Sequence, residues 1–517
     1  MTVGNWFAKL ASANSGIQGE NQRAGELLRR GAEHQNAGNS GAAEECYRQL
    51  LSLQPENAEA RHRLARILAA TGSASQERGE LGAAIEGYEE ALALEQGQAD
   101  VLNNLGNVYR DLGRLADAIA AFRNAIDVDG GRAEAHFNLG TALFQSGENA
   151  QAIAQCRTAL ALRASFPEAS MSLGYLLERE GDAPGAAACY RDAIAARPDF
   201  AEAHFNHALQ LLLAGDFEKG WEEYEWRLRM PDLAPLWPHA GRPRWDGSPL
   251  EGKAILLYAE QGFGDAIQFV RFAPLVAERG GKVILSCAAS LMPLFENIPG
   301  IAALADWSKP APAFDLCCSL LSLPRIFRTT IATLPAKTPY LHANPEKLRR
   351  WNARLAPDAA ALKVGLVWAT QSSNKSAQSR SLKLDMFAPL AAVGEILFCS
   401  LQKGPGAEHV AHAPAGMRII DFGREIGDFS DTAALIANLD LVISIDTAVA
   451  HLAGALARPV WTLTDWPPEW RWLLGRDDTP WYSTMRLYRR GRAEPWEDVI
   501  ARVAEALRPL AGRRAQR

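Results

Sequence analysis

Four eight-residue segments begin 34 residues apart and align without gaps: ADVLNNLG (99–106), AEAHFNLG (133–140), PEASMSLG (167–174) and AEAHFNHA (201–208). Each segment ends in glycine or alanine, and a second glycine follows seven residues later, at Gly113, Gly147, Gly181 and Gly215. A repeat of this length predicts a stack of two-helix units, because a single helix pair cannot bury its apolar face alone.

The period and its pattern of small and large residues resemble the tetratricopeptide repeat, a helix-turn-helix unit. The resemblance implies that Gly106, Gly140 and Gly174 let helices approach closely, and that Phe122, Cys156, Tyr190 and Tyr224 fill the facing sockets. Repeats also begin near Ala58 and Ala24, the former with seven extra residues, GSASQER, before Gly79. We therefore expect an N-terminal segment (1–23) and about six repeats (24–230) that form an all-α superhelix with a concave groove.

Polar residues of the first helices are the candidate lining of that groove: Asn103, Asn104, Asn107, His136, Asn138, His204 and Asn206. An asparagine amide both donates and accepts hydrogen bonds, so such side chains can hold a peptide backbone. A plain solvated face is the alternative, and the sequence leaves both open. The groove predicts a protein or peptide partner, and self-association into a homo-oligomer also stays open.

The repeats end at a linker, residues 231–250, whose five prolines exclude a continuing helix. Trp237 and Trp245 indicate that this linker docks against a neighbouring part of the protein. Beyond it, apolar runs alternate with helical patterns, and the series restarts at KVGLVWA (363–369). The pattern predicts two Rossmann-like α/β lobes, 251–345 and 346–510, then a basic tail, 511–517, with a ligand cleft at the carboxyl ends of the strands.

Several stretches of this half resemble the bacterial glycosyltransferases related to the ADP-heptose transferases, which have the GT-B fold. They are EQGFGDAIQFVRFAPLV (260–276), GLVWA (365–369), RSL (380–382) and DLVISIDTAVAHLAGALARPVW (440–461). Repeats ahead of such a domain are similar in plan to the O-linked N-acetylglucosamine transferases. The resemblance implies a metal-independent glycosyltransferase that uses a nucleotide-sugar as substrate and no further cofactor.

A departing diphosphate must be stabilised in such a reaction, and a helix N-terminus can do so. The helix after DLVISID offers the N–H groups of Thr447 and Ala448, with Asp446 as the expected N-cap. His451 lies one turn further on the same face, and the resemblance favours it as a ligand to phosphate over a plain buried histidine.

The loop after KVGLVWA contains the expected phosphate-binding cation. The resemblance favours Arg380, followed by Ser381, with Lys375 and Lys383 as rivals. Gln402 is expected to line the nucleotide pocket. Thr370 and Gln371 stand where many relatives have glycine and asparagine, which leaves the identity of the donor open.

Asp265 follows Gly262 and Gly264, which we expect to bend the chain between a strand and a helix. The motif lacks the third glycine of the dinucleotide fingerprint and the G-K-[ST] of a P-loop. A carboxylate beside a phosphate costs Coulomb energy, so Asp265 predicts another role. It either stabilises the helix terminus or is the general base for the acceptor hydroxyl, and the resemblance makes the catalytic role the leading one.

Near the C-terminus, Trp466, Trp470, Trp472 and Trp481 form an aromatic cluster. Indoles either stack on sugar rings or fill a lobe interface, and we favour the structural role. The last helix, WEDVIARVAEALRPL (496–510), is expected to return to the first lobe, ahead of a disordered tail.

The bulk composition excludes several classes of protein. A formal net charge of -6 argues against a nucleic-acid-binding protein. The sequence has neither a long apolar run nor a recognisable secretion signal, which predicts a cytoplasmic protein with no membrane insertion. Its seven scattered cysteines suggest neither a disulfide framework nor a zinc site.

The leading hypothesis is a glycosyltransferase that modifies a protein docked by the repeats, such as a flagellin or another surface protein. One alternative is a non-enzymatic scaffold with a degenerate transferase domain, and the other is a glycolipid- or polysaccharide-directed glycosyltransferase. The sequence leaves open the sugar, the nucleotide and the stereochemistry of transfer.

Overall fold

The computed structural model describes residues 3–230, 241–358, 361–370 and 380–515. Part of the predicted linker, including Trp237, lies outside the described residues, as do Gln371 and Lys375. The chain divides into two compact units, Met1–Leu176 and Leu177–Arg517. The last repeats therefore belong to the same unit as the α/β half, whereas the sequence suggested a boundary near residue 230.

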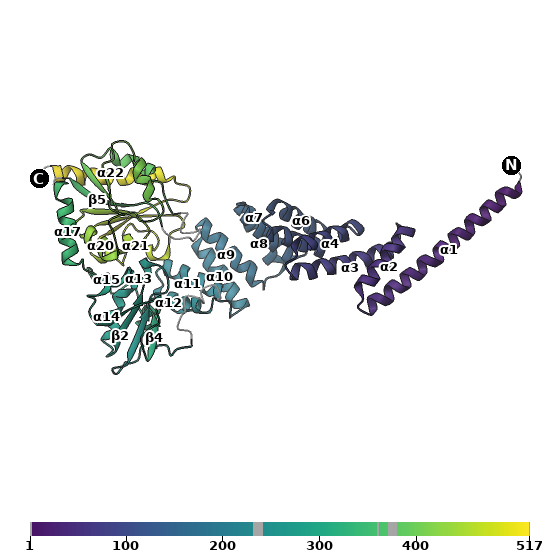
Figure 1. The fold of residues 1–517 in the computed structure, drawn as a ribbon, viewed down its shortest axis with the longest axis horizontal. Coiled ribbons are helices and arrows are strands. Elements are labelled where there is room, and N and C mark those ends of the chain that lie inside the picture. Colours follow the sequence, from purple (N-terminus) through teal and green to yellow (C-terminus); the bar gives the residue numbers. More distant parts are fainter. Residues whose placement is uncertain (1–2, 231–240, 359–360, 371–379, 516–517) are drawn as a thin grey trace. The chain divides into compact units, whose positions relative to one another are not determined.

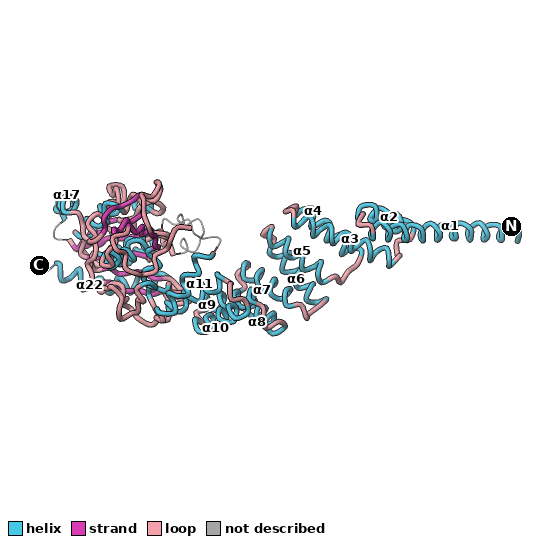
Figure 2. The backbone as a smooth tube through the Cα atoms, turned by 90° about the horizontal axis from the view of Figure 1, so that it is seen from below, coloured by secondary structure: helices cyan, strands magenta, loops and turns pink. Residues whose placement is uncertain are grey.

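The first unit consists of consecutive helices that pack as antiparallel pairs (Figures 1 and 2). They are α1 (Val3–Asn36), α2 (Ser40–Leu53), α3 (Ala58–Glu77), α4 (Leu81–Leu94), α5 (Ala99–Asp111), α6 (Leu115–Val128), α7 (Ala133–Gln145), α8 (Asn149–Leu162) and the start of α9 (Pro167–Glu180). The predicted N-terminal segment is part of α1, and the seven extra residues lengthen α3.

The regular spacing of small residues has a direct steric cause in the repeats. Gly113 and Gly147 end helices with φ of +73° and +88°, a left-handed conformation that glycine adopts readily. A Cβ atom on Gly106 would lie 2.6 Å from a ring carbon of Phe122. The predicted pairing of a small residue on one helix with a large residue on the next is therefore confirmed.

The second unit begins with the remaining repeat helices, α10 (Ala183–Ala196), α11 (Ala201–Leu213) and α12 (Phe217–Tyr224), followed by the 3-10 helix η1 (Glu225–Arg229). Trp221 of α12 is buried, and its ring lies 5.3 Å from Trp470 and 6.1 Å from Phe269 of the α/β half. Arg227 of η1 is fully buried and pairs with Glu260, just after the first strand. The last repeat thus shares a core with the α/β half.

Two parallel sheets follow. The first lobe has strands β1 (Ala254–Tyr258), β2 (Lys282–Cys287), β3 (Ile301–Asp306) and β4 (Leu316–Ser319) in the order β3-β2-β1-β4. The second lobe has β5 (Leu362–Val367), β6 (Ile396–Ser400), β7 (Ile419–Asp421), β8 (Leu441–Ile445), β9 (Val460–Thr464) and β10 (Met485–Arg489) in the order β10-β9-β8-β5-β6-β7. The second order is that of the Rossmann fold, which confirms the predicted α/β lobes.

Helices cover these sheets. The first lobe has α13 (Phe263–Phe269), α14 (Ala273–Ala277), α15 (Met292–Phe295) and α16 (Leu323–Ile326), and the second has α17 (Pro345–Leu355), α19 (Ala388–Ala391), α20 (Phe429–Ala437), α21 (Ala448–Ala455) and α22 (Trp496–Ala515). Helix α22 lies beside the second sheet (Figure 1), and its apolar residues pack with β5, β10 and α19. The expected return to the first lobe is therefore wrong, and the predicted disordered tail is helical through Ala515.

No helix in the described ranges has the length and apolarity that crossing a lipid bilayer requires.

Candidate functional site

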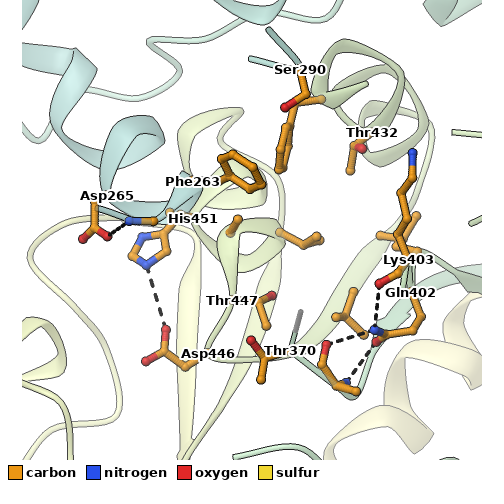
Figure 3. A pocket seen from close by; sticks show the side chains of 18 of the residues that line it. Phe263, Asp265, Ser290, Thr370, Gln402, Lys403, Thr432, Asp446, Thr447 and His451 are labelled. Atoms are coloured by element: carbon orange, nitrogen blue, oxygen red, sulfur yellow. Dashed lines mark hydrogen bonds and ion pairs between the residues drawn. The ribbon is translucent and has the colours of Figure 1, made fainter. Parts of the chain in front are cut away.

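The two sheets direct the carboxyl ends of their strands toward one cavity of about 860 Å³ (Figure 3). In the second lobe the cavity lies beside β5, which pairs with β6 on one side and with β8 on the other. The strand order reverses at this point, and open parallel sheets usually bind their ligands there. The lining includes Gly262, Gly264, Asp265, Trp307, Thr370, Arg380, Gln402, Lys403, Asp446, Thr447, Ala448, His451, Glu469 and Arg471. Most of the predicted site residues of the α/β half therefore come together in one place.

On the first lobe, the wall is the loop between β1 and α13. Gly262 is the N-cap of α13, and its N–H donates to Asp265 Oδ2 at 2.9 Å. Asp265 is thus a capping carboxylate in the first turn, where it also interacts favourably with the helix dipole. The predicted capping role is confirmed, and the general-base role stays a prediction.

The two glycines of this loop were expected to bend the chain. Their positions indicate another reason why glycine is needed here. Gly262 has an ordinary φ of −71°, and Gly264 lies within α13. A Cβ atom on Gly264 would lie 2.9 Å from His451 Cδ2 of the second lobe. Gly264 is therefore required because α13 and α21 pack directly against each other.

Arg471, in the 3-10 helix η8 (Trp470–Trp472), joins the two lobes at the cavity. Its guanidinium donates to Asp265 Oδ1 and to Glu469 Oε1, and its Nε donates to Gln268 Oε1 at 2.7 Å. Its backbone N–H donates to the second oxygen of Glu469 at 2.9 Å. One cation therefore holds two carboxylates, one from each lobe.

Glu469 has an unusual proton affinity. Burial raises the pKa of Glu469 to about 7, the nearby Asp446 and Asp265 add to this rise, and Arg471 opposes it. Two carboxylates also keep the pKa of Arg471 above its usual value, although burial acts in the opposite direction. At neutral pH the guanidinium is charged while Glu469 is close to its titration midpoint.

The opposite wall of the cavity is the start of α21. Thr447, not Asp446, is the N-cap, because the helix begins at Ala448, so the predicted cap is wrong by one residue. Within the described part of the chain the Thr447 side chain makes no capping hydrogen bond, and its hydroxyl lies 3.0 Å from Ser444 Oγ. The first N–H groups of a helix have no partner within it, so this end can accept an anion.

Asp446 is held in place by two donors. Its Oδ2 accepts from Arg380 Nη1 and from the indole N–H of Trp472, both at 3.0 Å. Asp446 therefore positions Arg380, whose side chain is 31% exposed, at the rim of the cavity.

His451 is buried behind Thr447, with its ring directed toward Asp446 (Figure 3). Its Nδ1 lies 3.0 Å from the Tyr482 hydroxyl, whereas its Nε2 lies 3.9 Å from Asp446 Oδ1, beyond hydrogen-bonding length. Burial lowers the pKa of His451 to about 3, although Asp446 opposes this effect. The imidazole is therefore neutral at physiological pH.

The other residues that were predicted to bind the nucleotide-sugar have different surroundings. Ser381 supports the loop, because its hydroxyl accepts the Thr370 N–H at 3.0 Å. Gln402 lines the cavity, but its amide oxygen accepts the N–H groups of Trp368 and Ala369, and its nitrogen donates to backbone carbonyls. Its polar group thus ties the end of β5 to the end of β6. Lys383 is exposed to solvent, which favours Arg380 as the cation of the site.

Two of the predicted groove residues are buried between helices. His136 bonds Gln155 Oε1 and the Gly130 carbonyl, and His204 bonds Glu223 and the Pro198 carbonyl. The prediction that these histidines line a docking groove is therefore wrong, because both rings are buried, with one nitrogen bonded to the following helix and the other to the loop before their own helix.

The asparagines are half-buried: Asn103, Asn104, Asn107, Asn138 and Asn206. The Asn138 amide donates to Asn103 Oδ1 at 2.9 Å, which links successive repeats. The Asn107 side-chain oxygen is buried and has no partner among the described residues. Their role in docking stays a prediction.

The aromatic cluster has the favoured structural role. Trp470, Trp472 and Trp481 are buried, and Trp466 packs on the turn at Gly181, where a Cβ atom would contact the indole. The sequence alone assigned no role to Glu469, Arg471, Lys403 or Trp307. Within the described ranges, no group of three His, Cys, Asp or Glu side chains could hold a metal ion.

Comparisons with known proteins agree with this architecture. The tetratricopeptide repeat family matches residues 28–99, 72–133, 103–170, 137–199 and 171–225. The family described as glycosyltransferase family 9 (heptosyltransferase) matches residues 390–465, which carry β6, β7, α20, β8, α21 and β9 of the second lobe.

A curated relative, protein FlbA of Caulobacter vibrioides, is 30% identical over 331 residues, which are 59% of this chain and 55% of FlbA. The chain thus spans about half the length of this relative. A crystal structure of MamA is 26% identical and covers 31% of this chain and 92% of its own, with a TM-score of 0.29. The structure titled as pilF of Pseudomonas aeruginosa is 22% identical. It covers 41% of this chain and 94% of its own, with a TM-score of 0.31. The chain therefore carries tetratricopeptide repeats followed by a glycosyltransferase family 9 domain.

Proposed function

We propose that this protein transfers a sugar from a nucleotide-sugar to a hydroxyl of a protein held by its repeats, in the cytoplasm. The observation that supports the proposal best is the contrast between the walls of the cavity. The second lobe presents the open N-terminus of α21 beside Arg380, whereas the first lobe presents the carboxylate of Asp265. Such a cavity suits an anionic leaving group on one side and a hydroxyl to be deprotonated on the other.

The diphosphate of the donor would lie at Thr447 and Ala448. The helix N–H groups and Arg380 would offset the negative charge that develops as the bond to the sugar breaks. His451 is neutral, so its Nε2 would act as a hydrogen-bond donor or acceptor without adding charge.

The acceptor hydroxyl would lie on the Asp265 side of the cavity. The hydroxyl oxygen attacks the anomeric carbon while a carboxylate of the site takes its proton. The bond from the anomeric carbon to the diphosphate breaks, and the nucleoside diphosphate leaves with the electron pair. All atoms and charges of the two substrates appear in the products.

A protein acceptor is favoured by the repeats. Repeat arrays bind extended segments along their concave surfaces, and the half-buried asparagines 103, 104, 107 and 138 offer amides to a peptide backbone. A glycolipid- or polysaccharide-directed transferase would use the same cavity, with the repeats recruiting other proteins. A non-enzymatic scaffold is the other alternative, because Thr370 departs from the pattern of related enzymes.

Intact-mass measurement of candidate surface proteins co-expressed with this protein tests the proposal. We expect a sugar-sized mass increase with the wild type, its loss with Asp265→Ala, and its retention with Asp182→Ala, an exposed helix cap far along the chain from the cavity. Turnover of a nucleotide-sugar without any modified protein would favour the saccharide-directed alternative. The absence of both nucleotide-sugar binding and turnover by the wild type would contradict any enzymatic function.

A further inference from the structure

The cavity contains two carboxylates that contact the same guanidinium. Asp265 comes from the first lobe and Glu469 from the second, and Arg471 donates to one oxygen of each. In both carboxylates, a backbone N–H binds the other oxygen: Gly262 N–H for Asp265 and Arg471 N–H for Glu469. Both side chains line the cavity, 19% and 28% exposed respectively, so either could reach a bound hydroxyl.

Asp265 has a structural role at the start of α13. It is the third residue of this helix, and its Oδ2 accepts the N–H of the N-cap residue Gly262. Its Oδ1 accepts from Arg471, so the same carboxylate joins α13 to η8.

Glu469 has no α-helix to cap. It precedes a 3-10 helix of three residues, too short for a macrodipole, and lies near Asp446 and Asp265. Like charges in one cavity disfavour full ionisation of both groups. The charged groups that face Glu469 are thus Arg471 of its own element, Asp265 of α13 and Asp446 of the β8–α21 loop, the last paired with Arg380.

We propose that Glu469 takes the proton of the acceptor hydroxyl, while Asp265 caps α13 and positions Arg471. This inference rests on the proposed glycosyl transfer. The acceptor O–H bond breaks and its proton passes to a Glu469 oxygen, while the acceptor oxygen bonds the anomeric carbon and the nucleoside diphosphate leaves. Because Glu469 belongs to the second lobe, the donor-binding lobe itself supplies the base.

The pH dependence of turnover distinguishes the two carboxylates. The wild type is first screened with UDP-, GDP- and ADP-sugars for release of nucleoside diphosphate, with water as the acceptor. The nucleotide-sugar that is turned over is then used to measure the variants. With the wild type, we expect the rate to rise with pH through a midpoint near the pKa of Glu469, about 7. Glu469→Gln should lower the rate about 100-fold and abolish this rise.

Asp265→Asn should lower the rate but keep the rise, with its midpoint at lower pH, because one neighbouring negative charge is lost. A rise that persists in Glu469→Gln, or that disappears in Asp265→Asn, would overturn the inference. His451 does not titrate in this range, so it leaves the rise unaffected.

A measurement without substrate keeps this inference separate from the proposed function. A Glu469 pKa raised in the folded state makes the wild type lose stability as pH increases from about 4.5 through 7. The melting temperature of Glu469→Gln relative to the wild type should therefore increase from pH 5 to pH 8. Glu395→Gln, an exposed glutamate of the same lobe, should show no such trend. An equal trend in both variants would contradict the inference even if the protein transfers sugar.

Discussion

Two helices begin at the same cavity, and their N-termini differ in capping: one has a side-chain cap and the other has none among the described residues. In the first lobe, α13 begins at Phe263, and Asp265 within its first turn accepts the N-cap N–H. In the second lobe, α21 begins at Ala448, and the Thr447 side chain makes no capping hydrogen bond among the described residues. Each helix follows a buried parallel strand, so their difference comes from a few side chains and not from the fold.

This difference supports the proposed placement of the two substrates at the two walls. The negative charge of Asp265 already compensates the dipole of α13, and a second anion there would be repelled. The uncompensated N-terminus of α21 can accept a phosphate, and Arg380 stands beside it. Substitutions that make the two helix ends alike should therefore have the largest effects.

Thr447→Asp would give α21 the same kind of carboxylate that caps α13. We expect nucleoside diphosphate to bind at least about 100-fold more weakly, because like charges about 4 Å apart repel by about 4 kcal/mol at an effective dielectric constant of 20. Calorimetric titration with ADP, GDP and UDP measures this loss. Thr447→Asn, a neutral cap of similar shape, should bind within a few-fold of the wild type, and equal binding by Thr447→Asp would place the diphosphate elsewhere.

Asp265→Ala would remove the carboxylate from α13. We expect a loss of about 2 kcal/mol in the free energy of unfolding, since a cap is lost and Arg471 keeps only one carboxylate in a largely buried site. Urea unfolding of the second unit, followed by tryptophan fluorescence, checks this value. Asp182→Ala removes an exposed cap without a buried partner and should cost only about 1 kcal/mol. Equal losses in the two variants would indicate that the pair with Arg471 contributes nothing to stability.

His451→Gln tests the neutral imidazole behind α21. Because its folded pKa of about 3 lies below the usual 6.5, the wild type loses stability as pH falls below 6.5. The loss reaches about 2 kcal/mol at pH 5, at about 1.36 kcal/mol per pH unit, and should disappear in His451→Gln. Glu469 has the opposite slope in this range, so the difference between variant and wild type is the informative quantity. The exposed His342→Gln should follow the wild type.

Arg380→Ala should have the smallest effect. We expect nucleoside diphosphate to bind about 10-fold more weakly, or about 1.4 kcal/mol, because Arg380 is partly exposed and shares its charge with Asp446. Lys383→Ala should change the affinity less than twofold, and the calorimetric titration above compares the two. A larger loss with Lys383→Ala would make the rival lysine the phosphate-binding cation.

Patterns of local origin were predictable from the sequence. The 34-residue period, the turn glycines such as Gly113 and the pairing of Gly106 with Phe122 depend on contacts between adjacent helices. The strand-helix alternation likewise predicted two α/β lobes, and the strand ends brought Asp265, Arg380, Thr447 and His451 to one cavity.

Other features depended on residues far apart in the chain. His136 and His204 are polar residues of the first helices of their repeats, and only packing shows that they are buried. Nothing local distinguishes a helix that returns to the first lobe from α22, whose apolar face matches the second. Glu469 and Arg471 stand in a tryptophan-rich stretch, where composition alone favours a structural interpretation.

The sequence by itself determined the repeats, the two Rossmann-like lobes and the set of polar residues at the strand ends, because helix and strand periodicity are local properties. Only the tertiary structure decided which helix end is free, why Gly264 must be glycine and how Arg471 joins Asp265 to Glu469. These features depend on distances between segments about 200 residues apart. Such distances, and the burial that raises the pKa of Glu469, arise only when the two lobes pack together.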